Sequence, residues 1–289
     1  MIPIIVSGAS GQLGKAFLDR LSFKDGFSVF SFDRGQLDIT DEVKIQNILT
    51  TLPQTKYWIN CAAYKKVDDA ESNPEEAIRI NAVAPGVIGE ACAKADVHLI
   101  DFSSDYVYHN TLRRPLLETD PTEPKGVYAR TKLDGERSIQ ASGCRHTILR
   151  TSWIYGPGGR NFVYTMLRLG AEKEKLRIVG DQLGAPTFTH DIVWAVKNLI
   201  QQAEENNSEA IEGIFNFSNK GEVTWDQFAR KIFELSNMTC AVESTTTEAY
   251  GAPAPRPLYS VMNCSKISAL LDAPIPHWED ALKRFLDMT

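Results

Sequence analysis

Short apolar runs alternate with helix-like segments through the first half of the chain. The runs at 2–7, 27–32, 57–62, 98–103 and 146–151 have the length and composition of buried strands. Helical periodicity follows most of them, over a first helix that ends near residue 21 and then over 41–52, 74–95 and 128–141. Such alternation is typical of right-handed crossovers between parallel strands. We therefore expect an α/β fold with a doubly wound parallel sheet.

Two helix starts can be placed from single residues. Thr40 is a plausible N-cap for the helix at 41–52, because a hydroxyl there can accept a hydrogen bond from a free backbone N–H. Pro74 suits the first turn of the helix at 74–95, where its missing N–H costs nothing.

The pattern changes after about residue 155. The glycine-rich segment 156–159 breaks it, and helices are then predicted at 162–173, 189–204 and 224–236 with short strands at 176–179 and 214–217. We predict two units: a domain at 1–155 that contains the parallel sheet, and a smaller mixed α/β lobe at 156–289. The boundary is approximate, and some crossing of the chain between the units is expected.

Composition narrows the class of partner. The 289 residues are 43% hydrophobic and carry a net charge of −6, which argues against nucleic acid or an anionic membrane as the main partner. No signal-like segment and no long apolar run stands out, so we expect a soluble, cytoplasmic protein. The five cysteines form no Cys-x-x-Cys and the histidines no ligand-spaced pair, so neither a disulfide framework nor a metal site is predicted.

A glycine turn follows the first predicted strand and opens the first helix. Its glycines are Gly8, Gly11 and Gly14, three apart instead of in the usual G-x-G-x-x-G order. Backbone N–H groups of such a turn can approach a pyrophosphate at the helix N-terminus. This position predicts a Rossmann-type dinucleotide site, although a tight turn without a ligand has the same sequence.

The end of the second predicted strand bears on the choice of cofactor. Asp33 can accept hydrogen bonds from the adenosine ribose, which favours NADH, whereas the neighbouring Arg34 can pair with a 2′-phosphate, which favours NADPH. Asp38 can reach the adenine amine, or it can be an ordinary turn residue. The sequence leaves NADH and NADPH open.

A tyrosine and a lysine lie four residues apart, on one face of a predicted helix. Of the nine tyrosines only Tyr128 has a lysine at this spacing, Lys132. An ammonium favours the phenolate and should lower the phenol pKa from about 10. Ser104, in a Ser-Ser-Asp-Tyr run, can supply a hydroxyl. The three groups suit reduction of a carbonyl, although an exposed helical Tyr–Lys pair has the same spacing.

Several motifs together resemble the dTDP-4-dehydrorhamnose reductases, which are extended short-chain dehydrogenases/reductases. They are GASGQLG, INCAAYKKVDDAE, SSDYVY, YARTK, RTSWIYG, NFVYTMLR and DQLGAPTF, in that order over nearly the whole chain. The resemblance implies NAD(P)H-dependent reduction of the C4 keto group of a nucleotide-linked 6-deoxy-hexose, dTDP-4-dehydro-L-rhamnose to dTDP-L-rhamnose. Ser104 stands where the family usually has threonine, and its hydroxyl can donate the same hydrogen bond.

The resemblance also implies roles for the two units and for individual residues. The domain at 1–155 would be the NAD(P)-binding Rossmann domain, and the lobe at 156–289 would bind the substrate. Tyr128, Lys132 and Ser104 would be catalytic. The cofactor would contact Gly8, Ser10, Gly11, Gln12, Leu13, Gly14, Asp33, Arg34, Asp38, Ile39, Ala62, Ala63, Tyr64 and Lys65, together with Tyr128 and Lys132. The substrate would contact Ser104, Asp105, Tyr128, Trp153, Asn161, Gln182 and Arg256, the last through its diphosphate. The acidic group of Asp68, Asp69 and Glu71 is interpreted as exposed surface.

Departures from the family pattern leave assembly and function partly open. Some members join subunits through magnesium held by glutamates, but this chain has Lys15 and His190 at those places, so a metal-bridged dimer is doubtful and a homodimer stays open. A second interpretation is an NADP-binding regulatory subunit that resembles the beta subunit of methionine adenosyltransferase. A third is another nucleotide-sugar reductase or epimerase.

Overall fold

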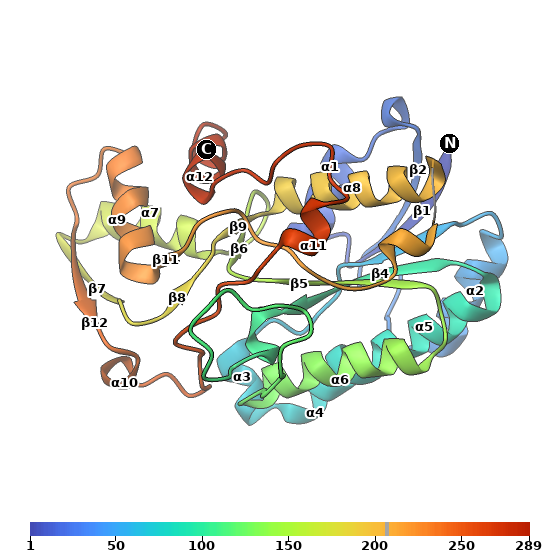
Figure 1. Cartoon of the computed structure of the whole chain (residues 1–289), viewed down its shortest axis with the longest axis horizontal. Coiled ribbons are helices and arrows are strands. Elements are labelled where there is room, and N and C mark those ends of the chain that lie inside the picture. Colours follow the sequence, from blue (N-terminus) through green and yellow to red (C-terminus); the bar gives the residue numbers. More distant parts are fainter. Residues whose placement is uncertain (206–207) are drawn as a thin grey trace.

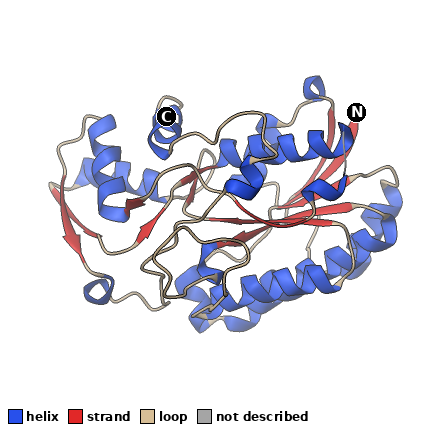
Figure 2. Ribbon diagram, in the orientation of Figure 1, coloured by secondary structure: helices blue, strands red, loops and turns tan. Residues whose placement is uncertain are grey.

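The computed structural model describes residues 1–205 and 208–289, and a parallel sheet lies at its centre. All its strand pairs are parallel, and their order is β10-β5-β4-β3-β1-β2. The strands are β1 (Ile2–Ser7), β2 (Phe27–Phe32), β3 (Tyr57–Asn60), β4 (His98–Ser104), β5 (His146–Thr151) and β10 (Gly213–Asn216). Helices cover both faces (Figures 1 and 2). The expected doubly wound, Rossmann-type sheet is confirmed.

Alternation along β1 divides the interior into two cores. Ile4 and Val6 pack with one face of helices, α1 (Gln12–Arg20) and α8 (Thr189–Glu205). Ile5 points the other way and packs with α2 (Glu42–Thr51), α5 (Ala84–Ala95) and α6 (Val127–Ala141). Successive side chains of a strand face opposite sides, so one continuous apolar run serves both cores.

The strand order changes direction between β1 and β3. From β1 the chain moves outward to β2, then returns to the other side of β1 and continues through β3, β4 and β5. Open α/β sheets bind ligands at the carboxyl ends of the strands at such a switch point. Gly8, which follows β1, has φ +72°, and a Cβ there would lie 2.6 Å from the backbone nitrogen of Ala62 after β3. Only glycine allows the two segments to approach this closely.

The second half of the chain builds a smaller mixed α/β lobe, on the left in Figure 1. Its aromatic core includes Tyr155, Phe188, Phe228 and Phe285. The strands are β6 (Ile154–Tyr155), β7 (Lys175–Val179), β8 (Leu183–Gly184), β9 (Thr187–Phe188), β11 (Val223–Thr224) and β12 (Ala241–Thr245). The helices are α7 (Phe162–Glu172), α9 (Trp225–Leu235), α10 (Thr247–Tyr250) and α12 (Trp278–Leu286).

Several elements from beyond residue 155 belong to the central sheet and its helical cover. Strand β10 pairs with β5, and α8 and α11 (Ser265–Ser268) pack in the same core as α1. The chain therefore crosses back after the start of the second lobe. The division at 155/156 stays a prediction, made with such crossing in view.

The helix predicted at 74–95 differs from the structure. It consists of α4 (Pro74–Ile78), a π-helical turn (Arg79–Val83) and α5, and it is preceded by α3 (Val67–Ser72), which was not predicted. The side chain of Asn81 in the π-turn accepts from the backbone N–H of Tyr64 (2.8 Å) and donates to its carbonyl (2.9 Å). Periodicity does not reveal this contact because it is made to a distant segment.

The predicted N-cap at Thr40 is wrong by one residue. Asp41 caps α2, because its side chain accepts from the backbone N–H of Lys44 at 3.1 Å. The Thr40 hydroxyl instead donates to Asp38 at 2.8 Å. Short 3₁₀ turns complete the elements at η1 (Phe23–Asp25), η3 (Asp105–Val107) and η4 (Ser208–Ile211).

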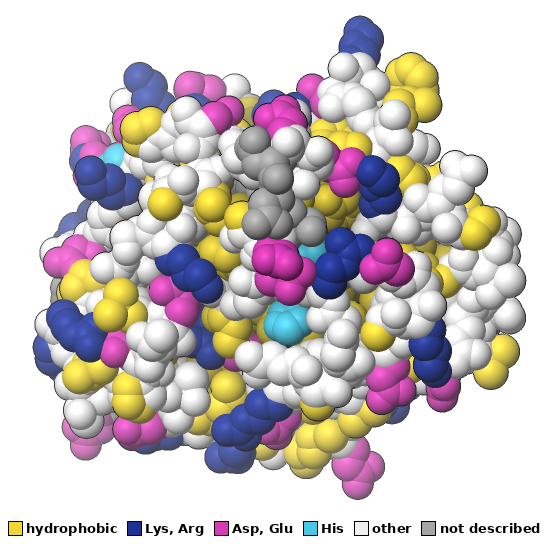
Figure 3. All heavy atoms as spheres, turned by 45° about the vertical axis from the view of Figure 1, so that its right-hand side comes forward, with side chains coloured by type: hydrophobic (Ala, Val, Ile, Leu, Met, Phe, Trp, Pro, Cys, Tyr) yellow, Lys and Arg dark blue, Asp and Glu magenta, His cyan; other side chains and the backbone are white. Residues whose placement is uncertain are grey.

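The surface carries mixed charge. Basic and acidic side chains are interspersed over the face shown in Figure 3, without a broad patch of one sign. Within residues 1–205 and 208–289, no helix has the length and apolar character needed to cross a membrane.

Candidate active site

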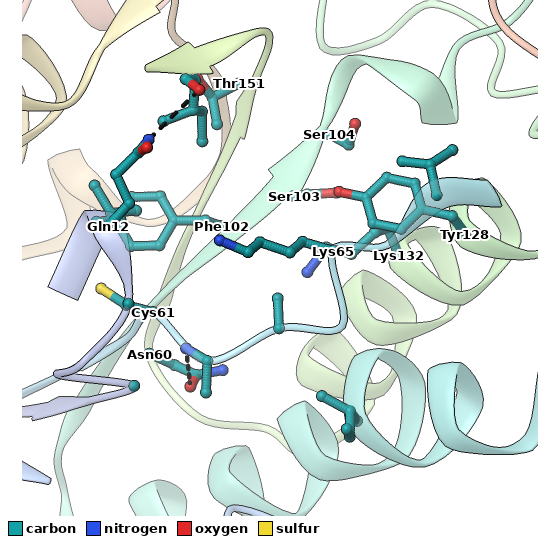
Figure 4. A pocket seen from close by; sticks show the side chains of 18 of the residues that line it. Gln12, Asn60, Cys61, Lys65, Phe102, Ser103, Ser104, Tyr128, Lys132 and Thr151 are labelled. Atoms are coloured by element: carbon teal, nitrogen blue, oxygen red, sulfur yellow. Dashed lines mark hydrogen bonds between the residues drawn. The ribbon is translucent and has the colours of Figure 1, made fainter. Parts of the chain in front are cut away.

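A pocket of about 600 Å³ opens at the carboxyl ends of β1, β3 and β4. Figure 4 shows Ser104 beside Tyr128, with Lys65 and Lys132 nearby and Gln12 across the cavity. The structure brings most of the predicted residues to its wall: Gly8, Ser10, Gly11, Gln12, Leu13, Arg34, Asp38, Ile39, Ala62, Ala63, Lys65, Ser104, Asp105, Tyr128, Lys132 and Trp153. Residues more than 100 positions apart therefore share one site.

The glycine turn forms one end of the pocket. A Cβ on Gly14 would overlap the carbonyl oxygen of Gly8, so the third glycine lets α1 begin directly against the turn. The N-terminus of α1 therefore lies at the pocket wall with Gly11 and Gln12. Free N–H groups and the helix dipole there suit a pyrophosphate. The steric requirement for glycine at Gly8 and Gly14 fits a dinucleotide.

Two arginines lie where the adenosine end of a dinucleotide is expected. Arg34 lines the pocket and pairs loosely with Glu76 at 3.6 Å. Arg79, which was not predicted, also lines it and donates to the Thr40 hydroxyl at 2.6 Å. Hydrogen bonds from Thr40, and then the charge of Arg79, hold the pKa of Asp38 below its ordinary value. This end of the pocket therefore combines an ionised carboxylate with two cations.

Tyr128 and Ser104 meet at the other end of the pocket. The Ser104 hydroxyl hydrogen-bonds with the Tyr128 phenol, which tends to lower the phenol pKa. Burial outweighs this effect and raises the pKa of Tyr128 to about 12. The expectation that Lys132 lowers this pKa is wrong for this structure. The Lys132 ammonium lies 3.8 Å from the Asp101 carboxylate instead, and it is not among the groups that shift the pKa of the phenol.

Asp105 adds a second acidic group beside the phenol. Its side chain is buried, and one carboxyl oxygen, Oδ2, has no hydrogen-bond partner among the described residues. Burial raises the pKa of Asp105 to about 7, and the hydrogen bond from Ser104 opposes that shift only in part. The carboxyl is therefore poised to change charge near neutral pH.

An aromatic stack lies on the side of the pocket formed by the second lobe. Trp153 has the left-handed backbone value φ +46° and stacks on Trp225, with ring centroids 3.5 Å apart and planes 11° apart. Gln182 accepts from the Trp225 indole N–H at 3.1 Å and donates to Thr247 at 2.9 Å. Phe162 flanks Trp225 at 4.6 Å. Flat apolar rings with fixed orientation can stack on a nucleobase.

Six of the predicted residues do not line the pocket: Gly14, Asp33, Tyr64, Asn161, Gln182 and Arg256. Asp33 accepts from the backbone N–H groups of Gly35 (2.8 Å) and Gln36 (3.1 Å) in its own turn. Asn161 caps α7 and donates to the Gln12 side chain at 3.0 Å, so it braces a pocket residue. Any ligand contact of these six stays a prediction.

Arg256 is already paired in the structure. Its guanidinium donates to both carboxylate oxygens of Asp68, at 2.9 and 2.7 Å. This bidentate pair lowers the pKa of Asp68 and explains why the arginine is not presented to the pocket. A diphosphate contact would require this pair to open.

The acidic cluster is not simply exposed surface, as the sequence suggested. Besides the Asp68 pair, Asp69 accepts a hydrogen bond from the Tyr64 hydroxyl. Glu71 accepts from the backbone N–H of Val127 at 2.7 Å, at the start of the helix that carries Tyr128. The cluster therefore anchors the helix that carries Tyr128 and the loops beside it.

Thirteen further residues line the pocket without having been predicted: Leu37, Asn60, Cys61, Val67, Arg79, Ile80, Phe102, Ser103, Tyr106, Thr151, Ile154, Arg160 and Trp225. Most of them adjoin predicted positions in the sequence. Their location just after the predicted strands could have identified them. Arg79 and Trp225 had no such signal, because each starts or interrupts a helix far from the motifs.

Comparisons with known proteins identify the family of the chain. The family model described as "RmlD substrate binding domain" matches residues 2–289. The dTDP-4-dehydrorhamnose reductase of Escherichia coli K12 is 36% identical over 98% of this chain and 97% of its own length. The spore coat polysaccharide biosynthesis protein SpsK of Bacillus subtilis is 35% identical over 99% and 97%.

A solved structure gives the same result. The crystal structure of dTDP-4-dehydrorhamnose reductase from Bacillus anthracis in complex with NADP is 34% identical, covers 100% of both chains and has a TM-score of 0.94. Epimerases such as the UDP-glucose 4-epimerase of Thermus thermophilus, at 18% identity and a TM-score of 0.80, share the fold. The chain belongs to the RmlD family, the family of the dTDP-4-dehydrorhamnose reductases.

Proposed function

We propose that this protein reduces the C4 keto group of a nucleotide-linked 6-deoxy-hexose, converting dTDP-4-dehydro-L-rhamnose to dTDP-L-rhamnose with NADPH or NADH. The observation that carries the proposal is the meeting of Ser104 and Tyr128 in the pocket that also contains the glycine turn. The full-length relatives named dTDP-4-dehydrorhamnose reductase support the substrate.

The pocket fits a nicotinamide dinucleotide. Gly8 and Gly14 leave room where a Cβ would collide, and the α1 N-terminus would hold the pyrophosphate. Arg34 and Arg79 would pair with a 2′-phosphate, which favours NADPH. When bound, the cofactor supplies the hydride for the carbonyl carbon.

The chain's own groups supply the proton. The Ser104 hydroxyl donates a hydrogen bond to the carbonyl oxygen and helps to orient it. Tyr128 gives its phenolic proton to that oxygen as negative charge develops there. A phenol with a pKa of about 12 remains protonated at neutral pH, so it is ready to act as the acid. Lys132, from the next turn of α6, supplies positive charge at the floor of the pocket.

The sugar nucleotide would lie between the catalytic groups and the Trp153–Trp225 stack. The rings offer a surface for the base, and Asp105 lies near the sugar end with Ser104. Arg256 would reach a diphosphate only after release from Asp68. These contacts are proposals that a structure with bound nucleotide sugar would test.

A coupled assay tests the function. Oxidation of NADPH that depends on dTDP-4-dehydro-L-rhamnose supports the reductase, and the Tyr128→Phe variant should lose about 10²-fold or more of kcat while retaining cofactor affinity. Near-wild-type turnover in this variant would remove Tyr128 from the mechanism. Cofactor binding without turnover in the wild type would instead favour the regulatory-subunit interpretation.

A further inference from the structure

A row of polar side chains lies beneath α6, on the face of the sheet that also carries the apolar core under that helix. Ser7 of β1 is in register with Asn60 of β3, and Asn60 is in register with Asp101 of β4. Register partners on neighbouring strands face the same side. The residues two positions earlier, Ile5, Trp58 and Leu99, pack in the core beneath α5 and α6. The row therefore continues that face toward the pocket.

Hydrogen bonds join the row from end to end. The Ser7 hydroxyl donates to Asn60 Oδ1 at 2.8 Å, and Asn60 Nδ2 donates to Asp101 Oδ2 at 2.6 Å. The Trp58 indole donates to the Ser7 hydroxyl at 3.0 Å. One oxygen of Asp101 is therefore fixed by the sheet, and the other, Oδ1, faces Lys132.

The ion pair that results is almost fully enclosed. Lys132 Nζ lies 3.8 Å from Asp101 Oδ1, and the two side chains are only 5% and 6% exposed. Either charge alone would be costly at this depth, so each one compensates the other. Burial raises the pKa of the Asp101 carboxyl, whereas Lys132 and Asn60 act to lower it.

We propose that Asp101 is a positioning residue, whose carboxylate holds the Lys132 ammonium at the floor of the pocket and limits how strongly that ammonium acts on Tyr128. The inference rests on the proposed function, because it takes Lys132 and Tyr128 as parts of the reductase. It explains why the phenol retains a high pKa although a lysine follows one helical turn later.

Other charged or titratable groups around the pair come from each element packed against it. Glu136 follows Lys132 by one turn and is neutralised by Arg150 of β5, at 2.6 Å. The remaining groups are Cys61 and Lys65 after β3, Asp105 after β4, Tyr128 on α6, and Cys144 before β5. Among these acidic side chains and Asp101 itself, Asp101 is the one that forms an ion pair with Lys132.

The test is the pH profile of kcat/KM for the reductase with NADPH and its keto sugar. Asp101→Asn keeps the shape of the side chain but removes its negative charge. The Lys132 ammonium then acts more strongly on Tyr128 and favours its phenolate form. We therefore expect the alkaline limb of the profile, where Tyr128 loses its proton, to move down by about one pH unit. Asp101→Glu should leave the limb near its wild-type position. Asp134→Asn is the matched control, because Asp134 is an exposed acid on the same helix, paired with Arg137.

An Asp101→Asn variant that is slower but has an unmoved alkaline limb would overturn the proposal, since loss of packing alone does not change the limb. If this variant does not fold, Asn60→Ala provides the second test, because it weakens the hold on Asp101 and should move the limb in the same direction. An unmoved limb there also overturns the proposal. Absence of activity in the wild type would refute the proposed function instead, so the two failures are distinguishable.

Discussion

Replacing Asp105 with asparagine should change how the stability of this protein depends on pH. Asp105 is 2% exposed, accepts a hydrogen bond from the Ser104 hydroxyl at 3.1 Å, and leaves its other oxygen without a partner among the described residues. Burial raises its pKa from 3.8 to about 7. Asparagine has nearly the same shape and does not titrate.

The raised pKa of Asp105 means that this carboxyl stabilises the folded state less as the pH rises. A carboxyl that binds its proton more tightly in the folded state contributes stability that is fully present below 3.8 and is lost as the pH rises through about 7. Between about pH 5 and about pH 8 the wild type should lose about 3 kcal/mol of unfolding free energy from this group. Asp105→Asn has no carboxyl at this place and should not show this loss. The free energy of unfolding of the variant minus that of the wild type should therefore be higher at pH 8 than at pH 5 by about 3 kcal/mol.

Urea unfolding of both proteins without cofactor, followed by tryptophan fluorescence at the two pH values, measures this difference. Other buried acids, such as Asp101, titrate in both proteins and cancel in the comparison. If the wild type and Asp105→Asn show the same change in unfolding free energy between the two pH values, the carboxyl does not titrate near neutrality and the reasoning fails.

Two further predictions concern charge elsewhere in the molecule. Arg34→Ala and Arg79→Ala should each raise the KM for NADPH about tenfold and change the KM for NADH little, because each removes a cation placed for a 2′-phosphate; equal effects on both cofactors would contradict this role. Glu136→Ala should lower the free energy of unfolding by about 3–5 kcal/mol in urea titrations, because it leaves the buried Arg150 guanidinium unpaired. Replacing both partners with apolar residues should cost less, and a similar cost would argue against that cause.

The sequence was sufficient to predict the alternating strands and helices of the first half of the fold. Each predicted strand of the first half lies in the central sheet, because apolar runs between helical segments have few other arrangements. The glycine turn was also informative, since Gly8 lies where a side chain would collide with Ala62. Local patterns predict well where a local requirement, such as burial or a positive φ, determines the residue.

The sequence was not sufficient where a distant partner determines the structure. Asn81 interrupts a helix because it bonds to the backbone of Tyr64, and Arg256 is held by Asp68, which is 188 positions away. Trp225 lines the pocket in a stack with Trp153, which is far from it in the sequence. The sequence around each of these residues is typical of an ordinary helix or loop. Its periodicity therefore does not predict the distant contact.

The place of β10 at the edge of the central sheet has a consequence for synthesis on the ribosome. Roughly 60 residues separate the end of β5 from the start of β10. At about 5–20 residues per second, the outer edge of β5 stays unpaired for roughly 3 to 12 s after that strand has been made. An open strand edge is a template for wrong pairing with another chain. Translation speed through the second lobe, and chaperones that act during that interval, should therefore influence the yield of folded protein.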